Sequence, residues 1–198
     1  MKKHSQNGED VYIWNYIQKH GLEVEPYFIE LGACDGKLRS NCRLFAEQGW
    51  GGVCIEANPE YFAKLFKLYM DSEIETINAA ILPSILEKGV VPFRIYPSHV
   101  DHSGIHKYPK FDECVTVEVD AIYYEDLPKH PIGLISIDLE GIDTAVLTDI
   151  LLSEHKPEFV IIESNNMEER RHQVDLLNID YDIINILDVN TIWHRREQ

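Results

Sequence analysis

The feature that most constrains this chain is the alternation of short apolar runs with longer amphipathic segments along most of its length. The apolar runs are continuous, which is typical of strands that are covered by helices on both faces. Most of them are separated by a segment of helix length, so each connection can return the next strand parallel to the last. We therefore expect an α/β fold, a three-layer sandwich with a mostly parallel sheet.

The predicted elements follow this alternation. Strands are expected at six apolar runs, residues 27–31, 52–56, 74–78, 134–138, 159–163 and 181–187. Helices are expected in five of the gaps, at residues 9–19, 40–48, 59–69, 143–152 and 167–177. Ser40 and Asn58 are candidate caps for two of these helices, because their side-chain oxygens can accept a hydrogen bond from the first turn.

Two regions depart from this rhythm. The run 181–187 is followed by a further apolar run at 191–195, and the connection Asp188-Val-Asn190 is too short for a helical crossover. An antiparallel hairpin that closes the sheet is therefore predicted. Two more strand candidates, 90–96 and 115–119, flank a polar loop at 97–113. Loops of this length in a compact domain are usually functional, so we expect a substrate loop there.

Length and charge limit the classes of function. A chain of 198 residues fits a single domain, 1–198. It lacks the roughly 18 consecutive apolar residues of a membrane helix, and its basic start is not followed by an apolar signal core, so we expect a cytoplasmic protein without membrane insertion. A formal net charge of -16 argues against nucleic acid and favours a small-molecule or glycan acceptor. The mildly basic stretches 169–172 and 194–198 are interpreted as solvated surface.

The loop after the first predicted strand, Gly32-Ala-Cys-Asp-Gly36, is the candidate cofactor site. Ligands of open α/β sheets bind beyond the carboxyl ends of the strands, and glycine lets the backbone approach a ligand closely. Glu56 ends the next predicted strand, near the spacing of about 20 residues at which an acidic residue binds ribose hydroxyls. A nucleoside-containing cofactor is therefore predicted.

The charge of this region distinguishes between two such cofactors. Carboxylates at Glu30 and Asp35 would repel a pyrophosphate, by about 4 kcal/mol per unit charge pair at 4 Å and an effective dielectric constant near 20. They suit the ammonium and sulfonium groups of S-adenosylmethionine. Cys34 also stands where the dinucleotide pattern GxGxxG has its second glycine. The methyl donor is thus favoured, and an NAD-dependent oxidoreductase remains the alternative.

Five motifs in order carry a family resemblance: Ser5-Gln-Asn-Gly-Glu-Asp10, Phe28-Ile-Glu-Leu-Gly-Ala-Cys-Asp-Gly36, Ser40-Asn41, Gly49-Trp-Gly-Gly-Val-Cys-Ile-Glu-Ala-Asn-Pro59 and Ile135-Ser-Ile-Asp-Leu-Glu-Gly141. Together they resemble the FkbM-type methyltransferases. The resemblance implies a class I methyltransferase (Rossmann-like) fold that uses S-adenosylmethionine. It also implies O-methylation of a hydroxyl on a sugar or a natural-product-like acceptor.

The resemblance also implies roles for single residues. The cofactor-binding set that it suggests is Gln6, Glu30, Gly32, Ala33, Asp35, Gly36, Ser40, Asn41, Glu56, Ala57, Asn78, Ala79 and Asp138. Within this set the loop residues surround the amino-acid part of the cofactor, Glu56 binds the ribose, and Asn78 and Ala79 lie against the adenine. Ser40 and Asn41 fall within reach of the cofactor's carboxylate, although a plain helix cap explains Ser40 equally well. The resemblance favours a role for helix 9–19 and the residues Gln6, Glu9 and Asp10 in covering the cofactor, and the alternative is that these side chains only cap the first helix.

Asp138 is the first candidate for the base that removes the acceptor's proton, with Glu140 in the same turn as a second carboxylate. Glu163 ends the next strand, so Asp138 and Glu163 together are candidate ligands of Mg²⁺.

The loop histidines His99, His102 and His106 are further candidates for the base, against their interpretation as solvated loop residues. A non-catalytic nucleoside-binding module that retains the fold is the remaining alternative to an enzyme.

Overall fold

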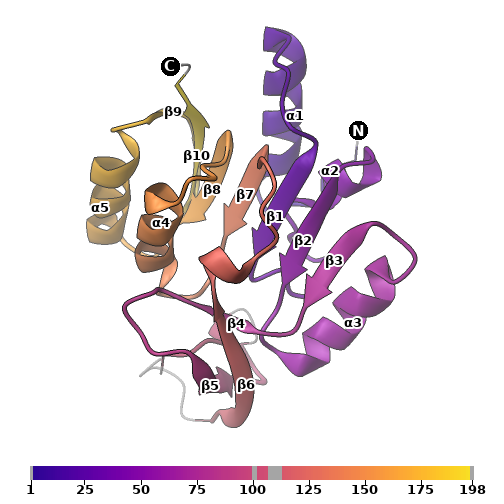
Figure 1. Cartoon of the computed structure of the whole chain (residues 1–198), viewed down its shortest axis with the longest axis vertical. Helices are drawn as coiled ribbons and strands as arrows, with labels where there is room; N and C mark the ends of the chain where they lie inside the picture. Colours follow the sequence, from indigo (N-terminus) through magenta and orange to yellow (C-terminus); the bar gives the residue numbers. More distant parts are fainter. Residues whose placement is uncertain (1, 100–101, 107–112, 197–198) are drawn as a thin grey trace.

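The computed structural model describes residues 2–99, 102–106 and 113–196. Its main sheet has seven strands in the order β3-β2-β1-β7-β8-β10-β9 (Figure 1). Their bounds are β1 Tyr27–Leu31, β2 Gly51–Ile55, β3 Ile74–Ile77, β7 Leu134–Ile137, β8 Phe159–Glu163, β9 Tyr181–Leu187 and β10 Asn190–Arg195. The first five of these strands run parallel, while β10 pairs antiparallel with both β8 and β9. The predicted mostly parallel sheet and its C-terminal hairpin are confirmed.

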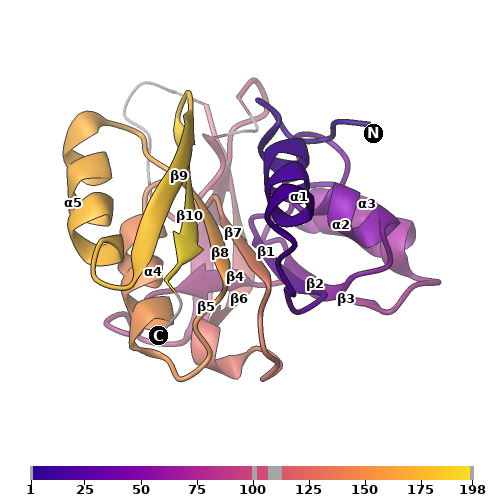
Figure 2. The same cartoon turned by 90° about the horizontal axis from the view of Figure 1, so that it is seen from above.

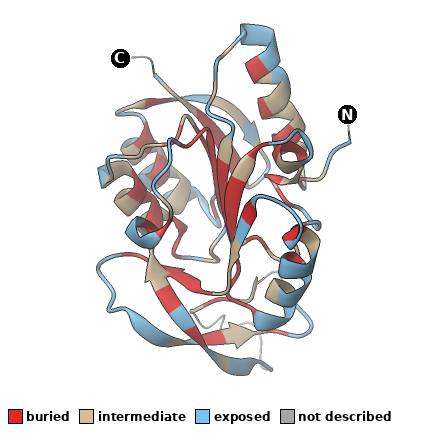
Figure 3. Ribbon diagram, turned by 45° about the vertical axis from the view of Figure 1, so that its right-hand side comes forward, coloured by how far each residue is buried: buried red, intermediate tan, exposed pale blue. Residues whose placement is uncertain are grey.

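Helices cover both faces of this sheet, as Figure 2 shows from above. On one side lie α1 (Glu9–His20), α2 (Arg43–Glu47) and α3 (Pro59–Tyr69), and on the other α4 (Asp143–Leu152) and α5 (Met167–Leu177). Each side has its own apolar core, and the strands between them are the most deeply buried part of the protein (Figure 3). Among the described residues, no helix is long and apolar enough to cross a membrane.

A second sheet of three strands lies beyond the carboxyl ends of β1 to β3 (Figure 1). It consists of β4 (Ala80–Leu82), β5 (Gly89–Ile95) and β6 (Val115–Tyr123), in the order β4-β6-β5. The runs 90–96 and 115–119 are strands, as predicted, but β6 extends to Tyr123 and β4 was not predicted at all. A small third core, which includes Phe93 and Val119, packs on one side of this sheet. The second sheet therefore forms a wall that faces the ends of the main strands.

Several predicted boundaries are wrong by a few residues. The strands expected at 52–56 and 134–138 end at Ile55 and Ile137, so Glu56 and Asp138 lie just beyond them. The helix expected at 40–48 begins only at Arg43, and the chain before it is not helical. The Ser40 hydroxyl donates to the buried Glu30 carboxylate and accepts from the Arg43 backbone amide at 2.9 Å, so it contacts the first turn as predicted. The strand expected at 74–78 ends at Ile77. There the side-chain amide of Asn78 donates to the carbonyl of Glu56 at 2.8 Å, and the chain turns toward β4. The cap predicted at Asn58 is confirmed, since its side chain accepts from the Glu60 amide.

The loop predicted at 97–113 is described in part, and residues 100–101 and 107–112 lie outside the described residues. Its described middle is not an open loop. Gly104 pairs with Arg94 of β5 through two backbone hydrogen bonds of 2.9 and 3.0 Å, and the Arg94 guanidinium donates to the carbonyl of Ile105. These contacts hold Gly104 and Ile105 against β5 of the second sheet.

Candidate active site

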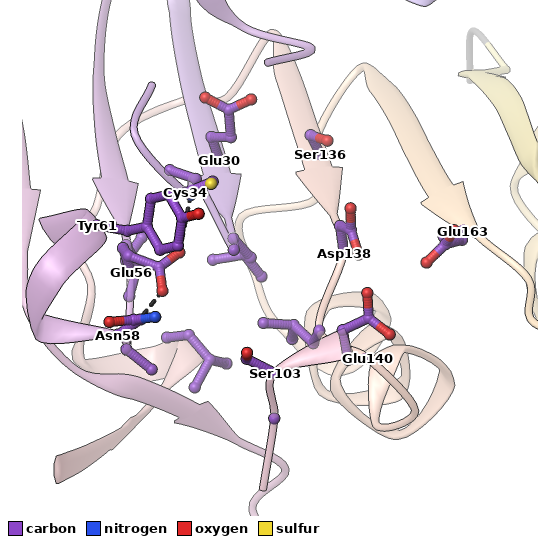
Figure 4. A pocket seen from close by; sticks show the side chains of 18 of the residues that line it. Glu30, Cys34, Glu56, Asn58, Tyr61, Ser103, Ser136, Asp138, Glu140 and Glu163 are labelled. Carbon is purple, nitrogen blue, oxygen red and sulfur yellow. Dashed lines mark hydrogen bonds between the residues drawn. The ribbon is translucent and has the colours of Figure 1, made fainter. Parts of the chain in front are cut away.

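A pocket of about 370 Å³ lies between the carboxyl ends of the central strands and the second sheet. This volume falls within the range of about 300–1,000 Å³ that is typical of small-molecule sites. Figure 4 shows that carboxylates reach it from several elements, namely Glu30 in β1, Glu56 after β2, Asp138 and Glu140 after β7, and Glu163 at the end of β8. The position at the strand ends is the one at which open α/β sheets bind ligands.

Gly32 allows the loop after β1 to approach the loop after β7 closely. A Cβ atom at this position would lie 1.9 Å from the backbone oxygen of Asp138, and the φ of Gly32 is 80°. Both facts exclude a side chain there. The amides of Gly32 and Ala33 donate to the carbonyl of Ile55 at 3.0 and 2.9 Å, which ties the loop to β2 as well. The floor of the pocket is thus a close junction of β1, β2 and β7.

Three residues other than glycine around the pocket adopt the left-handed conformation, Cys34 with φ 51°, Arg39 with φ 58° and Glu140 with φ 53°. Residues with a Cβ adopt this conformation at a cost in energy, and such residues gather at functional sites where the surrounding contacts impose them. The backbone around the pocket is therefore shaped by the fold rather than by local preference.

Glu56 is held as a fixed acceptor at the end of β2. Its two oxygens accept hydrogen bonds from the backbone amides of Cys34, at 2.8 Å, and Asn58, at 2.7 Å (Figure 4). The side chain is buried, and this burial raises its pKa to about 7 against the opposing effect of the two amides. Each carboxylate oxygen has a second lone pair, so Glu56 can still accept from a ligand's hydroxyl groups.

Glu30 is a buried carboxylate within β1. It lies within the strand predicted at 27–31, and it pairs in register with Cys54 of β2 and Ser136 of β7. It accepts from the Ser40 hydroxyl at 2.9 Å and from the Asn41 amide at 2.8 Å. Burial raises its pKa to about 7 despite these bonds. The Asn41 side chain continues the network by donating to the Ser136 hydroxyl at 2.9 Å.

Asp138, Glu140 and Glu163 form a cluster at the ends of β7 and β8. One carboxylate oxygen from each lies within 4.8 Å of the others. The side chain of Asp138 is open to the pocket, but the surrounding walls limit its hydration and the charge of Glu163 repels its own, so the pKa of Asp138 is raised well above its usual value. Burial and the charge of Asp143 raise the pKa of Glu163 as well. Such a cluster can take up a proton or a cation.

Of the three loop histidines, only His102 lines the pocket. Its Nδ1 lies 3.5 Å from the nearer oxygen of Glu140, and Ser103 and Gly104 follow it along the wall. His99 and His106 are exposed and are not among the residues that line the pocket.

The N-terminal segment reaches the pocket through Gln6. Its neighbours fold back on the start of α1: the Ser5 hydroxyl donates to Asp10 at 2.6 Å, and the Asn7 amide donates to Glu9 at 2.9 Å. Both carboxylates are fully buried. The motif Ser5-Gln-Asn-Gly-Glu-Asp10 therefore builds a rigid turn, and Gln6 is the member of it that lines the pocket.

Most of the predicted cofactor residues line this one pocket, and three of them do not. The Asp35 carboxylate accepts from the amides of Lys37 and Leu38 within its own turn. Gly36 packs against α3, where a Cβ atom would lie 2.7 Å from Leu65. Asn78 supports the loop after β2 from behind through its bond to the Glu56 carbonyl.

Several residues that sequence reasoning did not select line the pocket too, among them Arg39, Asn58, Tyr61, Ser103 and Ser136. A signal existed for Ser136, which is a polar residue inside an apolar strand run. Arg39 and Tyr61 carry no such signal. Only the fold brings the loop that contains Arg39 and the first turn of α3 that contains Tyr61 to the pocket.

Residues 30–188 match the model of the methyltransferase FkbM domain. The chain belongs to this family. The resemblance stated from five motifs is thus confirmed, and membership favours a methyltransferase over the NAD-dependent alternative. The family model does not cover the first 29 residues, so a single domain over 1–198 stays a prediction.

Solved structures agree in fold. A methyltransferase FkbM from Methylobacillus flagellatus KT is similar with a TM-score of 0.56 and 17% identity over 90% of this chain and 46% of its own. A precorrin-6y C5,15-methyltransferase from Geobacter metallireducens GS-15 has a TM-score of 0.52 and 11% identity over 100% of this chain and 92% of its own. The class I methyltransferase fold is therefore established.

Monomeric WbdD is also similar, with a TM-score of 0.50 and 14% identity over 96% of this chain and 41% of its own. The chain thus spans less than half the length of WbdD and of the Methylobacillus protein. No curated protein matches it in sequence.

Proposed function

We propose that the pocket binds S-adenosylmethionine and that the protein transfers its methyl group to a hydroxyl of a sugar or small natural-product-like acceptor. The observation that carries this proposal is the charge of the pocket. Five carboxylates line it, from Glu30, Glu56, Asp138, Glu140 and Glu163, and Arg39 and His102 are the basic residues among its described lining. A lining of this kind suits a ligand with a sulfonium and an ammonium group and disfavours a dinucleotide with its pyrophosphate.

The β1 and β2 side of the pocket would bind the cofactor. Glu56 is oriented by two backbone amides, so its remaining lone pairs can accept from the two ribose hydroxyls. Glu30 lies deeper, and its negative charge would attract the ammonium group. Ala57, Ala79 and Phe93 supply apolar contacts at the far side for an adenine ring.

The β7 side would carry out the chemistry. The cofactor supplies an electrophilic methyl group, and much of the acceleration comes from holding the acceptor oxygen in line with it. Asp138 is open to the pocket and has a raised pKa, and a raised pKa makes a carboxylate a stronger base toward the acceptor's proton. His102 and Glu140, 3.5 Å apart, could receive a proton by the same route.

A divalent cation is a second role for the same oxygens. Asp138, Glu140 and Glu163 supply three carboxylates in a cluster of the size that Mg²⁺ binds. A bound cation would lower the pKa of the acceptor hydroxyl and make a separate base unnecessary. Turnover that EDTA abolishes and Mg²⁺ restores would support the metal, and turnover unaffected by EDTA would support Asp138 as the base.

Calorimetry tests the cofactor. S-adenosylmethionine is expected to bind the wild type, and NAD is not. Glu56→Gln should weaken binding of S-adenosylmethionine by about tenfold to a hundredfold, because hydrogen bonds to a charged acceptor are lost. Glu60→Gln, an exposed carboxylate on α3, is the matched control and should bind as the wild type does. Absence of binding at millimolar S-adenosylmethionine would refute the proposal.

A further inference from the structure

A second hollow, of about 590 Å³, adjoins the mouth of the pocket and has the opposite charge. It is lined by five Lys and Arg side chains, those of Lys2, Lys3, Lys37, Arg39 and Arg43. Among the described residues that line it, Glu47 is the single carboxylate. This concentration of positive charge stands out in a chain whose formal net charge is -16. We call these lining residues the cationic hollow.

The fold builds the cationic hollow from two segments that are far apart in the sequence. The backbone of Ser5 forms a parallel bridge with that of Arg39, so the start of the chain runs beside residues 37–39. Asp10 fixes the first segment by accepting from the amide of His4 at 2.8 Å and from the Ser5 hydroxyl. The cationic side chains thus extend from anchored backbone.

The one carboxylate of the hollow is already engaged. Glu47 accepts from Arg43 at 3.0 Å and lies 3.0 Å from a ring nitrogen of His4. Glu47 thus offsets one cation of the five, and the charge of Arg39, which lines both cavities, also acts on Glu163. The three lysines still leave the hollow with an excess of positive charge. Like charges gathered in one concave surface raise the local potential and attract an anion.

The hollow is continuous with the proposed active site. Gln6, Leu38 and Arg39 line both cavities. The pocket itself is acidic, so an anionic group of a substrate is repelled from its interior and attracted to the hollow at its mouth. A molecule with an anionic end and a hydroxyl end would therefore be oriented with the hydroxyl toward Asp138.

We propose that the cationic hollow binds a phosphate or pyrophosphate group of the acceptor, and that the acceptor is therefore a phosphorylated alcohol such as a sugar phosphate. This inference rests on the proposed methyl transfer and adds the class of acceptor. Several cations from two segments can surround a compact group with two or more charges. A long nucleic-acid strand is disfavoured, because the rest of the surface has the same sign of charge as its phosphates.

Binding of three probes tests the proposal: inorganic pyrophosphate, glucose 1-phosphate and the neutral methyl glucoside. By calorimetry at low ionic strength, pyrophosphate and glucose 1-phosphate are expected to bind, at least about tenfold more tightly than methyl glucoside. Added salt should weaken both interactions. Lack of pyrophosphate binding at about 10 mM, the scale of weak sites, would overturn the proposal. Equal binding of the charged and neutral sugars would also overturn it.

The double variant Lys3→Gln/Lys37→Gln locates the site, because neither residue lines the acidic pocket. It should lose about tenfold or more in pyrophosphate affinity. The control is Lys64→Gln/Lys67→Gln on α3, which removes the same charge elsewhere and should change the affinity by less than about twofold. An equal loss in both double variants would overturn the proposal, because it would reduce the effect to net charge.

Affinity for S-adenosylmethionine separates the two levels of inference. It should stay within about twofold of the wild type in Lys3→Gln/Lys37→Gln. If the wild type binds S-adenosylmethionine but not pyrophosphate, the proposed role of the cationic hollow is refuted and the proposed function stands. If the wild type binds pyrophosphate but not S-adenosylmethionine, the proposed function is refuted and the hollow is only an anion-binding site.

Discussion

The carboxylates on the two sides of the pocket have different neighbours. On the β1 and β2 side, Glu30 and Glu56 are buried, and each accepts hydrogen bonds from backbone amides. On the β7 and β8 side, Asp138 and Glu163 lie beside each other, and their charges repel. A carboxylate fixed by amides is a preorganised binding group, whereas crowded carboxylates gain free energy by taking up a proton or a cation. The difference supports the proposal that one side binds the cofactor and the other carries out the chemistry.

The junction of the two sides should be the most sensitive position. Gly32→Ala would place a Cβ atom 1.9 Å from the backbone oxygen of Asp138, at a φ of 80°. We expect a loss of more than about 4 kcal/mol in the free energy of unfolding, or failure to fold, measured by urea denaturation. Gly49→Ala is the control, because Gly49 has a φ of 86° and open space around it. It should cost only about 1 kcal/mol. Equal losses in the two variants would contradict the close junction.

Variants on the two sides should separate binding from turnover. Asp138→Asn is isosteric and removes the charge of the candidate base. It should lower turnover by about a hundredfold or more, the range of a lost general base, and weaken the binding of S-adenosylmethionine less than Glu56→Gln does. The measurement is the formation of S-adenosylhomocysteine with a phosphorylated alcohol as acceptor, together with calorimetry. Asp149→Asn on α4, a residue that is not among those that line the pocket, is the control.

The pH dependence of stability should come mainly from the buried side. The pKa of Glu30 is about 7 in the folded protein and near 4.5 in its ordinary state, so the folded protein holds the proton more tightly. The contribution of protonated Glu30 to the free energy of unfolding is fully present below about pH 4.5. It is lost as the pH rises through 7, and the total loss is on the order of 3 kcal/mol. Glu30→Gln should therefore flatten the fall in stability between pH 5 and 8, measured by thermal unfolding. A slope unchanged from the wild type would contradict the assignment.

The smallest effect is expected at the link between Glu30 and β7. Ser136→Ala removes the acceptor of the Asn41 side chain, a hydrogen bond of 2.9 Å. The loss should be about 1 kcal/mol in the free energy of unfolding. Ser72→Ala, which removes a hydroxyl bond to the Tyr69 carbonyl at the surface end of α3, is the comparison.

The sequence was sufficient for the main sheet because its strands are continuous apolar runs. It was insufficient for β4, whose three residues are too few to show a period and whose partner β6 lies far along the chain. The same limit applies to the site. Gly32, Glu56 and Asp138 follow from the positions of strand ends, whereas Arg39 reaches the pocket through the backbone bridge between residues 5 and 39.

The cationic hollow illustrates this limit most clearly. The basic stretches that the sequence shows, 169–172 and 194–198, have charges that are adjacent along the chain. The hollow is instead assembled from two separate segments, residues 2–6 and 37–43. Charges that meet only through a long-range contact leave no local pattern.

The affinity for S-adenosylmethionine at two pH values tests the central claim most directly. If the fixed carboxylates of Glu30 and Glu56 bind a cationic cofactor, their loss of protons near pH 7 must strengthen binding. Calorimetry should show at least about a tenfold higher affinity at pH 8 than at pH 6, and Glu56→Gln should reduce this ratio. An equal affinity at the two pH values, or no binding at either, would contradict the account.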